Sequence, residues 1–521
     1  MKCYHGDILT VNVKDEVCSW LVEDGGKIVF VGNELPERYR GAELVELGGK
    51  ALCPSFADTH QHLASFSAFH AGLNVMDAAS NREISEMVRD FVRRSSAKTL
   101  IAFGASPYSV EEGRLLSRAE LDAVCPDRPM MVVKYDGHAC IINTPLLKKL
   151  EKKLAPLRGY HPDTGEMNQE AFFKVSDYIT NSLSPMELVK NLQNAVDFEA
   201  SRGIGMVHTV SGIGFVVNLD ITLEQFFARS LTNGFQVRVV PQSLDIRAAT
   251  RRKLPRIGGC FACALDGCFG SHDAAMNEPY TDDGAGGVLY YSDEKVTEFC
   301  KKANRAGLQI EMHAIGDRAF DQAARALRAA LDDFPREDHR HGIIHACLPT
   351  ETGLQICRDY HIQLPVQSAF INWKQEPDAY LERILGAERT AALNPLRTFW
   401  DMGIRICAGS DAPCTAPNPV DWIDKAVNHA NPAQALTVPE ALRMCTINGY
   451  RATFDEAERG SLEVGKIADM VMLSENPCKM EPARLHELRA EQLLLGGKPY
   501  ESCRRGVAGA MLKGMFSRAK A

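Results

Sequence analysis

The chain has 521 residues, of which 45% are hydrophobic and 24% charged, and a formal net charge of −8. These values are typical of a globular protein and exclude a disordered or fibrous chain. The negative charge and the lack of a Lys/Arg-rich stripe argue against nucleic-acid binding. Because the sequence contains no membrane-length apolar run or signal-peptide core, and its 16 cysteines are scattered, we expect a cytoplasmic protein without a membrane partner.

Both ends of the chain have the pattern of short β-strands. An alternating run at 27–32 lies between turn-rich segments, and a similar run occupies 467–473. The length of the chain favours more than one structural unit. We therefore expect residues 1–53 and 453–521 to form one small β-sandwich domain together.

Between these ends, apolar strand-like runs alternate with amphipathic helices, which is the pattern of an α/β protein with a parallel sheet. One helix is predicted to begin after Ser184, and a second, beginning after Ser292, precedes a strand that ends at His313. We expect residues 54–452 to form a (β/α)8 TIM barrel with an insertion at about residues 74–180.

Four segments combine an apolar strand with a residue that can bind metal. The H-x-H pair His60 and His62 places two imidazoles on one side of an extended chain, and His313, His345 and Asp411 end later strands. Imidazoles with one carboxylate suit Zn²⁺, with Fe²⁺ or Mn²⁺ as alternatives, and leave positions open for water and substrate. Each motif alone is more often a surface or core feature, but their order along the chain predicts a catalytic metal site.

The sequence resembles the amidohydrolase superfamily, most closely the branch that includes the N-substituted formamide deformylases. The similarity covers nearly the whole chain and rests on Asp58-Thr59-His60-Gln61-His62, Asp136-Gly137-His138 with Asn143, Asp266-Gly267, His313-Ala314-Ile315-Gly316-Asp317-Arg318-Ala319, His345-Ala346, Gly409-Ser410-Asp411-Ala412-Pro413 and the segment 460–469. The resemblance implies metal ligation by His60, His62, His313, His345 and Asp411, with Asp411 and His345 as catalytic residues.

The resemblance also implies a set of substrate-binding residues, which are His138, Glu170, Asp266, Arg318 and Gln367. For two of them a structural role is an equal alternative. Asp317 and Arg318 could pair at the start of a helix, and Asp266-Gly267 could form a turn.

The reaction that the resemblance implies is hydrolysis of a non-peptide C–N bond in a small molecule, such as an amide, formamide or cyclic amide. A metal-activated water would attack, and Asp411 would accept its proton and return it to the departing nitrogen. Deamination or non-hydrolytic decarboxylation on the same barrel, and a non-catalytic barrel that serves as a scaffold, remain open as alternatives. A homodimer is the default expectation for the oligomeric state.

One position departs from the family pattern. Relatives with two metal ions carry a bridging carboxylated lysine, which we expect four residues before Asp266, where this chain has Ala262. We therefore favour one metal ion over two. Cys260 could bridge two ions as a thiolate, but Cys260 and Cys263 lack a partner pair for a structural zinc site, so we favour a buried apolar filler at Cys260. The sequence does not assign a role to Cys263 or Cys268.

Overall fold

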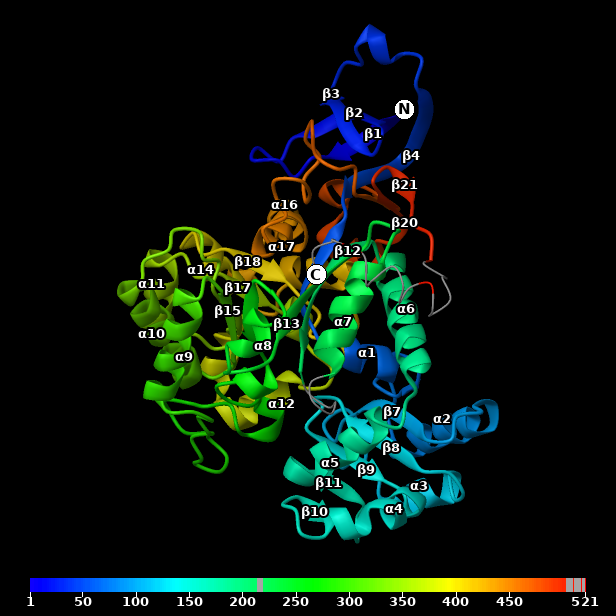
Figure 1. Ribbon diagram of the computed structural model, residues 1–521, viewed down its shortest axis with the longest axis vertical. Coiled ribbons are helices and arrows are strands. Elements are labelled where there is room, and N and C mark those ends of the chain that lie inside the picture. Colours follow the sequence, from blue (N-terminus) through cyan, green and yellow to red (C-terminus); the bar gives the residue numbers. More distant parts are fainter. Residues whose placement is uncertain (213–218, 503–508, 510–516, 518–520) are drawn as a thin grey trace.

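The computed structural model describes residues 1–212, 219–502, 509, 517 and 521. Figure 1 shows the sheet built from the chain ends at the top, an α/β region in the middle and the predicted insertion at the bottom. The predicted segment 453–521 is described only as far as residue 502. Beyond residue 502, every position except 509, 517 and 521 lies outside the described residues.

Both chain ends contribute to one seven-stranded sheet, in the order β21-β20-β19-β4-β1-β2-β3. Its strands are β1 (Lys2–Leu9), β2 (Val17–Asp24), β3 (Lys27–Gly32), β4 (Glu43–Pro54), β19 (Met470–Leu473), β20 (Ala490–Leu495) and β21 (Lys498–Pro499). The antiparallel pair β4 and β19 joins the two ends, because Ile8, Leu52 and Met470 share one buried apolar cluster. The two ends therefore pair in one sheet, and their assignment to a separate β-sandwich domain stays a prediction.

Eight strands of the central region form three sheets, β13-β12-β5, β14-β15-β16 and β17-β18, with parallel pairing throughout. The strands are β5 (Phe56–Gln61), β12 (Ile204–Ser211), β13 (Gln236–Pro241), β14 (Arg256–Gly259), β15 (Gln309–Ala314), β16 (Gly342–His345), β17 (Leu364–Val366) and β18 (Ile406–Ala408). Contacts of β13 with β14, β16 with β17 and β18 with β5 link the sheets in cyclic order. The strand ladders themselves do not close, so a complete (β/α)8 barrel stays a prediction.

Helices alternate with these strands. They are α1 (Leu63–His70), α6 (Pro185–Ser201), α7 (Leu219–Ser230), α8 (Arg247–Thr250), α9 (Asp293–Arg305), α10 (Asp317–Asp333), α11 (Glu351–Asp359), α12 (Asp378–Leu385), α13 (Ala387–Ala391), α14 (Leu396–Asp401), α15 (Pro419–Val427), α16 (Val438–Cys445) and α17 (Ile447–Ala452). The predicted helix starts are confirmed, since the side chains of Ser184 and Ser292 cap α6 and α9. Buried alanines on α10, including Ala319 and Ala323, form the apolar face that it packs inward, and α10 lies against α9.

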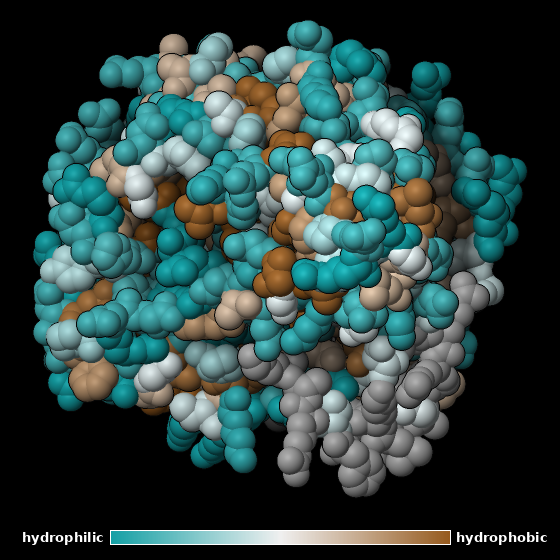
Figure 2. Space-filling view, turned by 90° about the horizontal axis from the view of Figure 1, so that it is seen from above, coloured by the Kyte–Doolittle hydropathy of each residue, from teal (hydrophilic) through white to brown (hydrophobic). Residues whose placement is uncertain are grey.

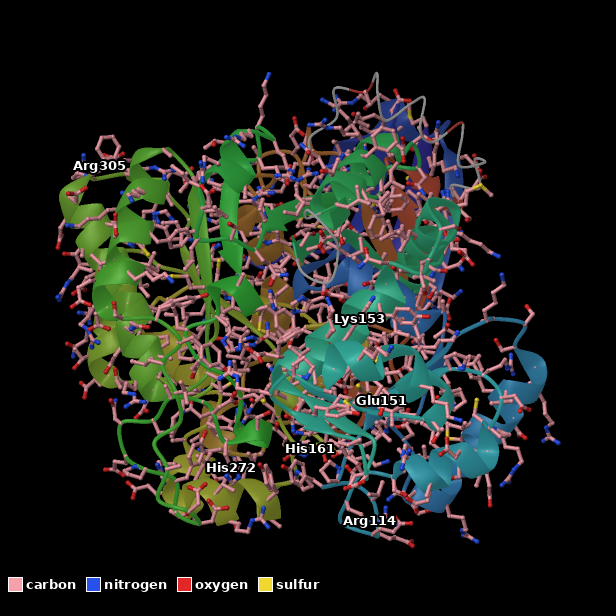
Figure 3. All side chains as sticks on the ribbon, turned by 60° about the horizontal axis from the view of Figure 1, so that its bottom comes forward. Arg114, Glu151, Lys153, His161, His272 and Arg305 are labelled. Carbon is pink, nitrogen blue, oxygen red and sulfur yellow. The ribbon has the colours of Figure 1, made fainter. Side chains whose placement is uncertain are left out.

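The insertion carries a sheet of its own, in the order β10-β11-β9-β8-β7-β6. Its elements are β6 (Leu73–Asn74), α2 (Asn81–Arg94), β7 (Leu100–Ala105), α3 (Arg118–Val124), β8 (Met130–Lys134), β9 (Ala139–Ile142), α4 (Thr144–Leu154), β10 (Tyr160–His161), β11 (Glu166–Asn168) and α5 (Gln169–Thr180). Figure 3 labels Glu151, Lys153 and His161 on this unit. The turn between β8 and β9 contains Gly137 at φ +71, a left-handed conformation that favours glycine, and it directs this loop toward the central region.

The face of the molecule in Figure 2 is mostly hydrophilic, and its hydrophobic residues appear as small separate groups. Large exposed hydrophobic side chains are likewise dispersed along the chain, as at Val13, Met186 and Val464. Within the described residues, every helix is too short or too polar to cross a bilayer.

Candidate metal centre

The five predicted metal ligands meet at the ends of strands in the central region. His60 Nε2 lies 3.1 Å and His62 Nε2 lies 3.3 Å from Oδ1 of Asp411. The rings of His313 and His345, at the ends of β15 and β16, have centroids 4.5 Å apart. All five side chains are buried. The structure therefore brings together residues separated by about 350 positions in the chain.

Backbone contacts between β5 and the segment after β18 fix the first group of side chains. The amide of Asp411 donates to the carbonyl of His60 at 2.7 Å, and the amide of His62 donates to the carbonyl of Ala412 at 2.9 Å. The buried carboxylate of Asp58 accepts from the Ser410 amide at 3.0 Å, the Ser410 hydroxyl at 2.6 Å and the His60 amide at 3.2 Å. Asp58 thus holds the two strand ends in register.

Polar side chains also orient His313 and His345. Nδ1 of His345 lies 2.5 Å from Oε1 of Gln367, and an amide oxygen can only accept, so His345 donates from Nδ1 and its Nε2 is free to bind a metal. Nδ1 of His313 lies 3.3 Å from a carboxylate oxygen of Asp266. Asp266 in turn accepts hydrogen bonds from the amides of Ala275, Ile315 and Gly316, which anchors it beside the histidine.

Cys260 is a further member of the cluster; its thiol is buried, as expected of a filler, but it faces histidine nitrogens. Its Sγ lies 3.2 Å from Nε2 of His60 and 3.7 Å from Nε2 of His345. Ligand atoms of these three residues and of Asp411 all lie within 4.8 Å of one another. Ala262, by contrast, lies in a 3₁₀ turn beyond the end of β14. The strand-end position next to the histidines is Cys260.

The charges at this site follow from burial and contact. Burial lowers the pKa of His60 and lowers that of His345 well below its usual value, so both rings are neutral at physiological pH. Burial alone would raise the pKa of Asp411, but the neighbouring His60 and His62 outweigh it and hold that pKa well below the ordinary range. Neutral imidazoles beside a carboxylate and a thiol are donors that a divalent ion such as Zn²⁺ accepts, so the residues fit a metal ion.

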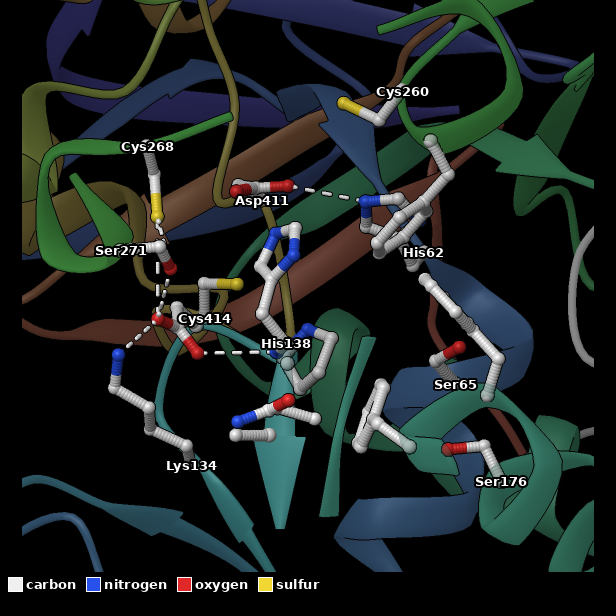
Figure 4. Close-up of a pocket in the computed structure, with 18 of the residues that line it drawn as sticks. His62, Ser65, Lys134, His138, Ser176, Cys260, Cys268, Ser271, Asp411 and Cys414 are labelled. Atoms are coloured by element: carbon white, nitrogen blue, oxygen red, sulfur yellow. Dashed lines mark hydrogen bonds and ion pairs between the residues drawn. The ribbon is translucent and has the colours of Figure 1, made fainter. Parts of the chain in front are cut away.

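A cavity of about 1590 Å³ opens above the cluster, and it reaches from the central region to the insertion. Of the predicted substrate-binding residues, His138, Asp266 and Glu170 line it. In Figure 4, His62, Cys260 and Asp411 point into one space and His138 points toward Asp411. Glu170 is exposed and forms an ion pair with Arg158 at 3.1 Å.

A buried ion pair that the sequence did not indicate supports the His138 wall of the cavity. Lys134 Nζ lies 2.7 Å from a carboxylate oxygen of Asp136, and Asp136 accepts a hydrogen bond from the His138 amide at 3.1 Å. The only sequence signal for the supporting role of Asp136 was its place in the Asp136-Gly137-His138 segment.

Two of the predicted substrate-binding residues lie away from the cavity. Gln367 is on the far side of His345, where its amide oxygen is occupied by the imidazole. The guanidinium of Arg318 donates to the carbonyl of Gly286 at 3.0 Å and also approaches that of Gly287. Neither side chain is among those that line the described cavity, and their predicted contact with the substrate stays a prediction.

Comparison with known proteins gives consistent matches over most of the chain. Residues 43–500 match the sequence model of the amidohydrolase family. The putative amidohydrolase YtcJ of Bacillus subtilis (strain 168) is 25% identical over 533 residues, which is 95% of this chain and 98% of YtcJ. The N-substituted formamide deformylase of Arthrobacter pascens is 23% identical over 553 residues, 95% of this chain and 96% of the relative. The crystal structure of an uncharacterized metal-dependent hydrolase from Pyrococcus furiosus shares the fold, with a TM-score of 0.73, 24% identity, and coverage of 92% of this chain and all of that one.

Proposed function

The chain belongs to the amidohydrolase family, and on this premise we propose that it hydrolyses a C–N bond other than a peptide bond in a small molecule. The observation that carries the proposal is the convergence of His60, His345 and Asp411 at a large cavity. The similarity to a formamide deformylase supports an amide or formamide as the bond that is cleaved.

The residues that would hold the metal are His60, His62, His313, His345 and Asp411. We propose zinc as the ion, because neutral imidazoles and one carboxylate are its usual ligands at catalytic sites. When bound, the ion supplies Lewis acidity, which activates water and polarises the substrate carbonyl. The cyclic order of the eight central strands supports the (β/α)8 barrel as the scaffold of this site.

Asp411 is the group that would move protons. Its pKa is held below the ordinary range by His60 and His62, so it is ionised at neutral pH. Its position beside the proposed ligands and at the cavity supports it as the acceptor of the proton from the attacking water. The same carboxyl lines the cavity, where it can return that proton to the departing nitrogen. His345 is proposed as the second catalytic residue, with its ring orientation fixed by Gln367.

The cavity wall supports a substrate with a bulky apolar group. Aromatic side chains from several elements line it, among them Phe69, Phe103, Phe173 and Phe261. His138 and Asp266 supply polar positions close to the cluster, and we propose that His138 contacts the polar end of the substrate. An N-formyl or N-acyl amine with an aromatic substituent matches this combination.

The test compares Asp411→Asn with the wild type on N-formyl, N-acyl and cyclic amides, with zinc-loaded protein. We expect Asp411→Asn to lower kcat at least about 100-fold, the lower range for loss of a general base, while Asp401→Asn on the exposed end of α14 keeps wild-type activity. Wild-type turnover by Asp411→Asn would contradict the mechanism. Ammonia release from a heterocycle would instead identify a deaminase, and a wild-type protein that binds no metal would favour a scaffold.

A further inference from the structure

We propose that Cys260 is a metal ligand and that its thiolate is shared between two metal ions. The inference rests on the proposed function, because it concerns the metal centre of the same site. It also changes the expected number of ions from one to two.

The position of Cys260 between two pairs of ligands is the first argument. His60 and His62 both contact Asp411 Oδ1, at 3.1 and 3.3 Å, while His313 and His345 form the second pair. The sulfur of Cys260 approaches one member of each pair, His60 at 3.2 Å and His345 at 3.7 Å. A single atom in contact with both pairs is placed to bridge them.

The number of donors is the second argument. Zinc at a catalytic site takes about three protein ligands and one exchangeable ligand. With Cys260 included, six side chains converge here, which is more than one such ion would use. Two ions, each bound by two histidines and sharing Cys260, account for the set, with Asp411 beside the His60 and His62 pair.

The local backbone is the third argument, because it brings Cys260 into the cluster. Gly258 and Gly259 end β14 at φ +124 and +96, a conformation that side-chain-bearing residues rarely adopt. A Cβ on Gly258 would lie 1.8 Å from the carbonyl oxygen of Glu311, so β14 and β15 approach closely at this point. The chain then turns into the 3₁₀ segment Phe261–Cys263, and the side chain of Cys260 contacts His60 and His345.

Metal binding at Cys260 is a proton exchange. As the metal–sulfur bond forms, the S–H bond breaks and the proton passes to solvent, so no oxidant or reductant is needed. The thiolate then contributes one negative charge between the two cations, the charge that a bridging lysine carbamate would supply. A sulfur ligand also favours zinc over magnesium or calcium.

The test uses cobalt as a spectroscopic substitute for zinc. Metal-free wild-type protein is titrated with Co²⁺, and we expect about two ions to bind per chain, with a thiolate-to-cobalt charge-transfer band in the near ultraviolet. Cys260→Ser should lose this band and bind about one ion. Cys263→Ala, which removes a buried cysteine outside the cluster, should keep both the band and the two ions.

Two controls make the result decisive. His272, labelled in Figure 3, forms a second possible cation cluster with the exposed Asp282 and Asp283, so His272→Ala is titrated to subtract binding there. X-ray absorption of the zinc-loaded wild type needs no variant, and it should show a Zn–S distance of about 2.3 Å.

The outcomes separate this inference from the proposed function. A wild type that binds metal without the charge-transfer band or a Zn–S distance would overturn the role of Cys260 and leave the hydrolase proposal intact. A band that persists in Cys260→Ser would also overturn it, and one bound ion with the band would overturn the bridge. A wild type that binds no metal would overturn both proposals.

Discussion

Replacement of Asp58 by alanine should separate the two strand ends that carry the proposed metal ligands. The Asp58 carboxylate is fully buried and accepts three hydrogen bonds, two from Ser410 and one from the His60 amide. The contacts of His60 and His62 with the Asp411 carboxylate also join these two segments, but only through the side chains of the proposed ligands. The alanine variant removes the acceptor and leaves three buried donors without a partner.

The expected cost follows from those donors. A buried polar group that loses its partner costs about 1–3 kcal/mol, and water that enters the space left by the carboxylate offsets part of this. We therefore expect Asp58→Ala to lower the free energy of unfolding of the central region by about 3–6 kcal/mol. Asp58→Asn keeps one oxygen for the two amides, so it should cost only about 1 kcal/mol.

Urea denaturation of metal-free wild type and both variants measures these differences, and zinc titration measures the effect on the site. Asp58→Ala should also bind zinc more weakly, because His60 and Asp411 lose their common register. The reasoning would be refuted if Asp58→Ala stayed within about 1 kcal/mol of the wild type, or if Asp58→Asn were equally destabilised.

Three further predictions concern the same framework. A Cβ on Gly409 would lie 2.7 Å from the His60 amide nitrogen, so Gly409→Ala should lower the free energy of unfolding by about 1–3 kcal/mol and weaken zinc binding in a titration. Gly41→Ala, whose Cβ would meet no atom within 4 Å, should change neither quantity. Arg238 and Asp455 form a buried ion pair at 2.9 Å, and Arg238→Met should lower the unfolding free energy by about 3–5 kcal/mol in urea. Burial raises the pKa of Asp455, but the contact with Arg238 outweighs burial and lowers that pKa. The difference in unfolding free energy between wild type and Asp455→Asn should therefore be largest at pH 7 and shrink below about pH 4, where the carboxyl becomes protonated. A difference that grows as the pH falls would contradict this sign.

Strand-end residues could be predicted from the sequence because their signals are local. Two histidines at spacing two must lie on one side of a strand, and a parallel α/β arrangement brings the ends of its strands to one edge. The pattern therefore indicated His60 and His62, and the positions of His313, His345 and Asp411 followed from the apolar runs before them. The caps at Ser184 and Ser292 were equally local.

Cys260 and Gln367 could not be assigned in this way. A cysteine in an apolar run is the same pattern whether its thiol contacts leucines or histidines, and only the glycine pair before it marks the unusual backbone. The role of Gln367 depends on which atom of His345 it meets, and that contact spans two different strands. The position expected for the bridging lysine was also misplaced along the chain. Strand β14 ends at Gly259, so Ala262 lies beyond the strand and Cys260 follows it directly.

The proposed metal ligands and part of the cavity wall come from different parts of the chain. The ligands are held by Asp58, Gln367 and Asp266, which all lie in the central region, whereas His138 and much of the aromatic wall come from the insertion. The insertion reaches the cavity through the loop between β8 and β9, held by the Lys134 and Asp136 pair. Variation in that loop can therefore change the shape of the cavity while the contacts that orient the proposed ligands stay intact. Within one family, this separation allows one metal centre to serve many substrates.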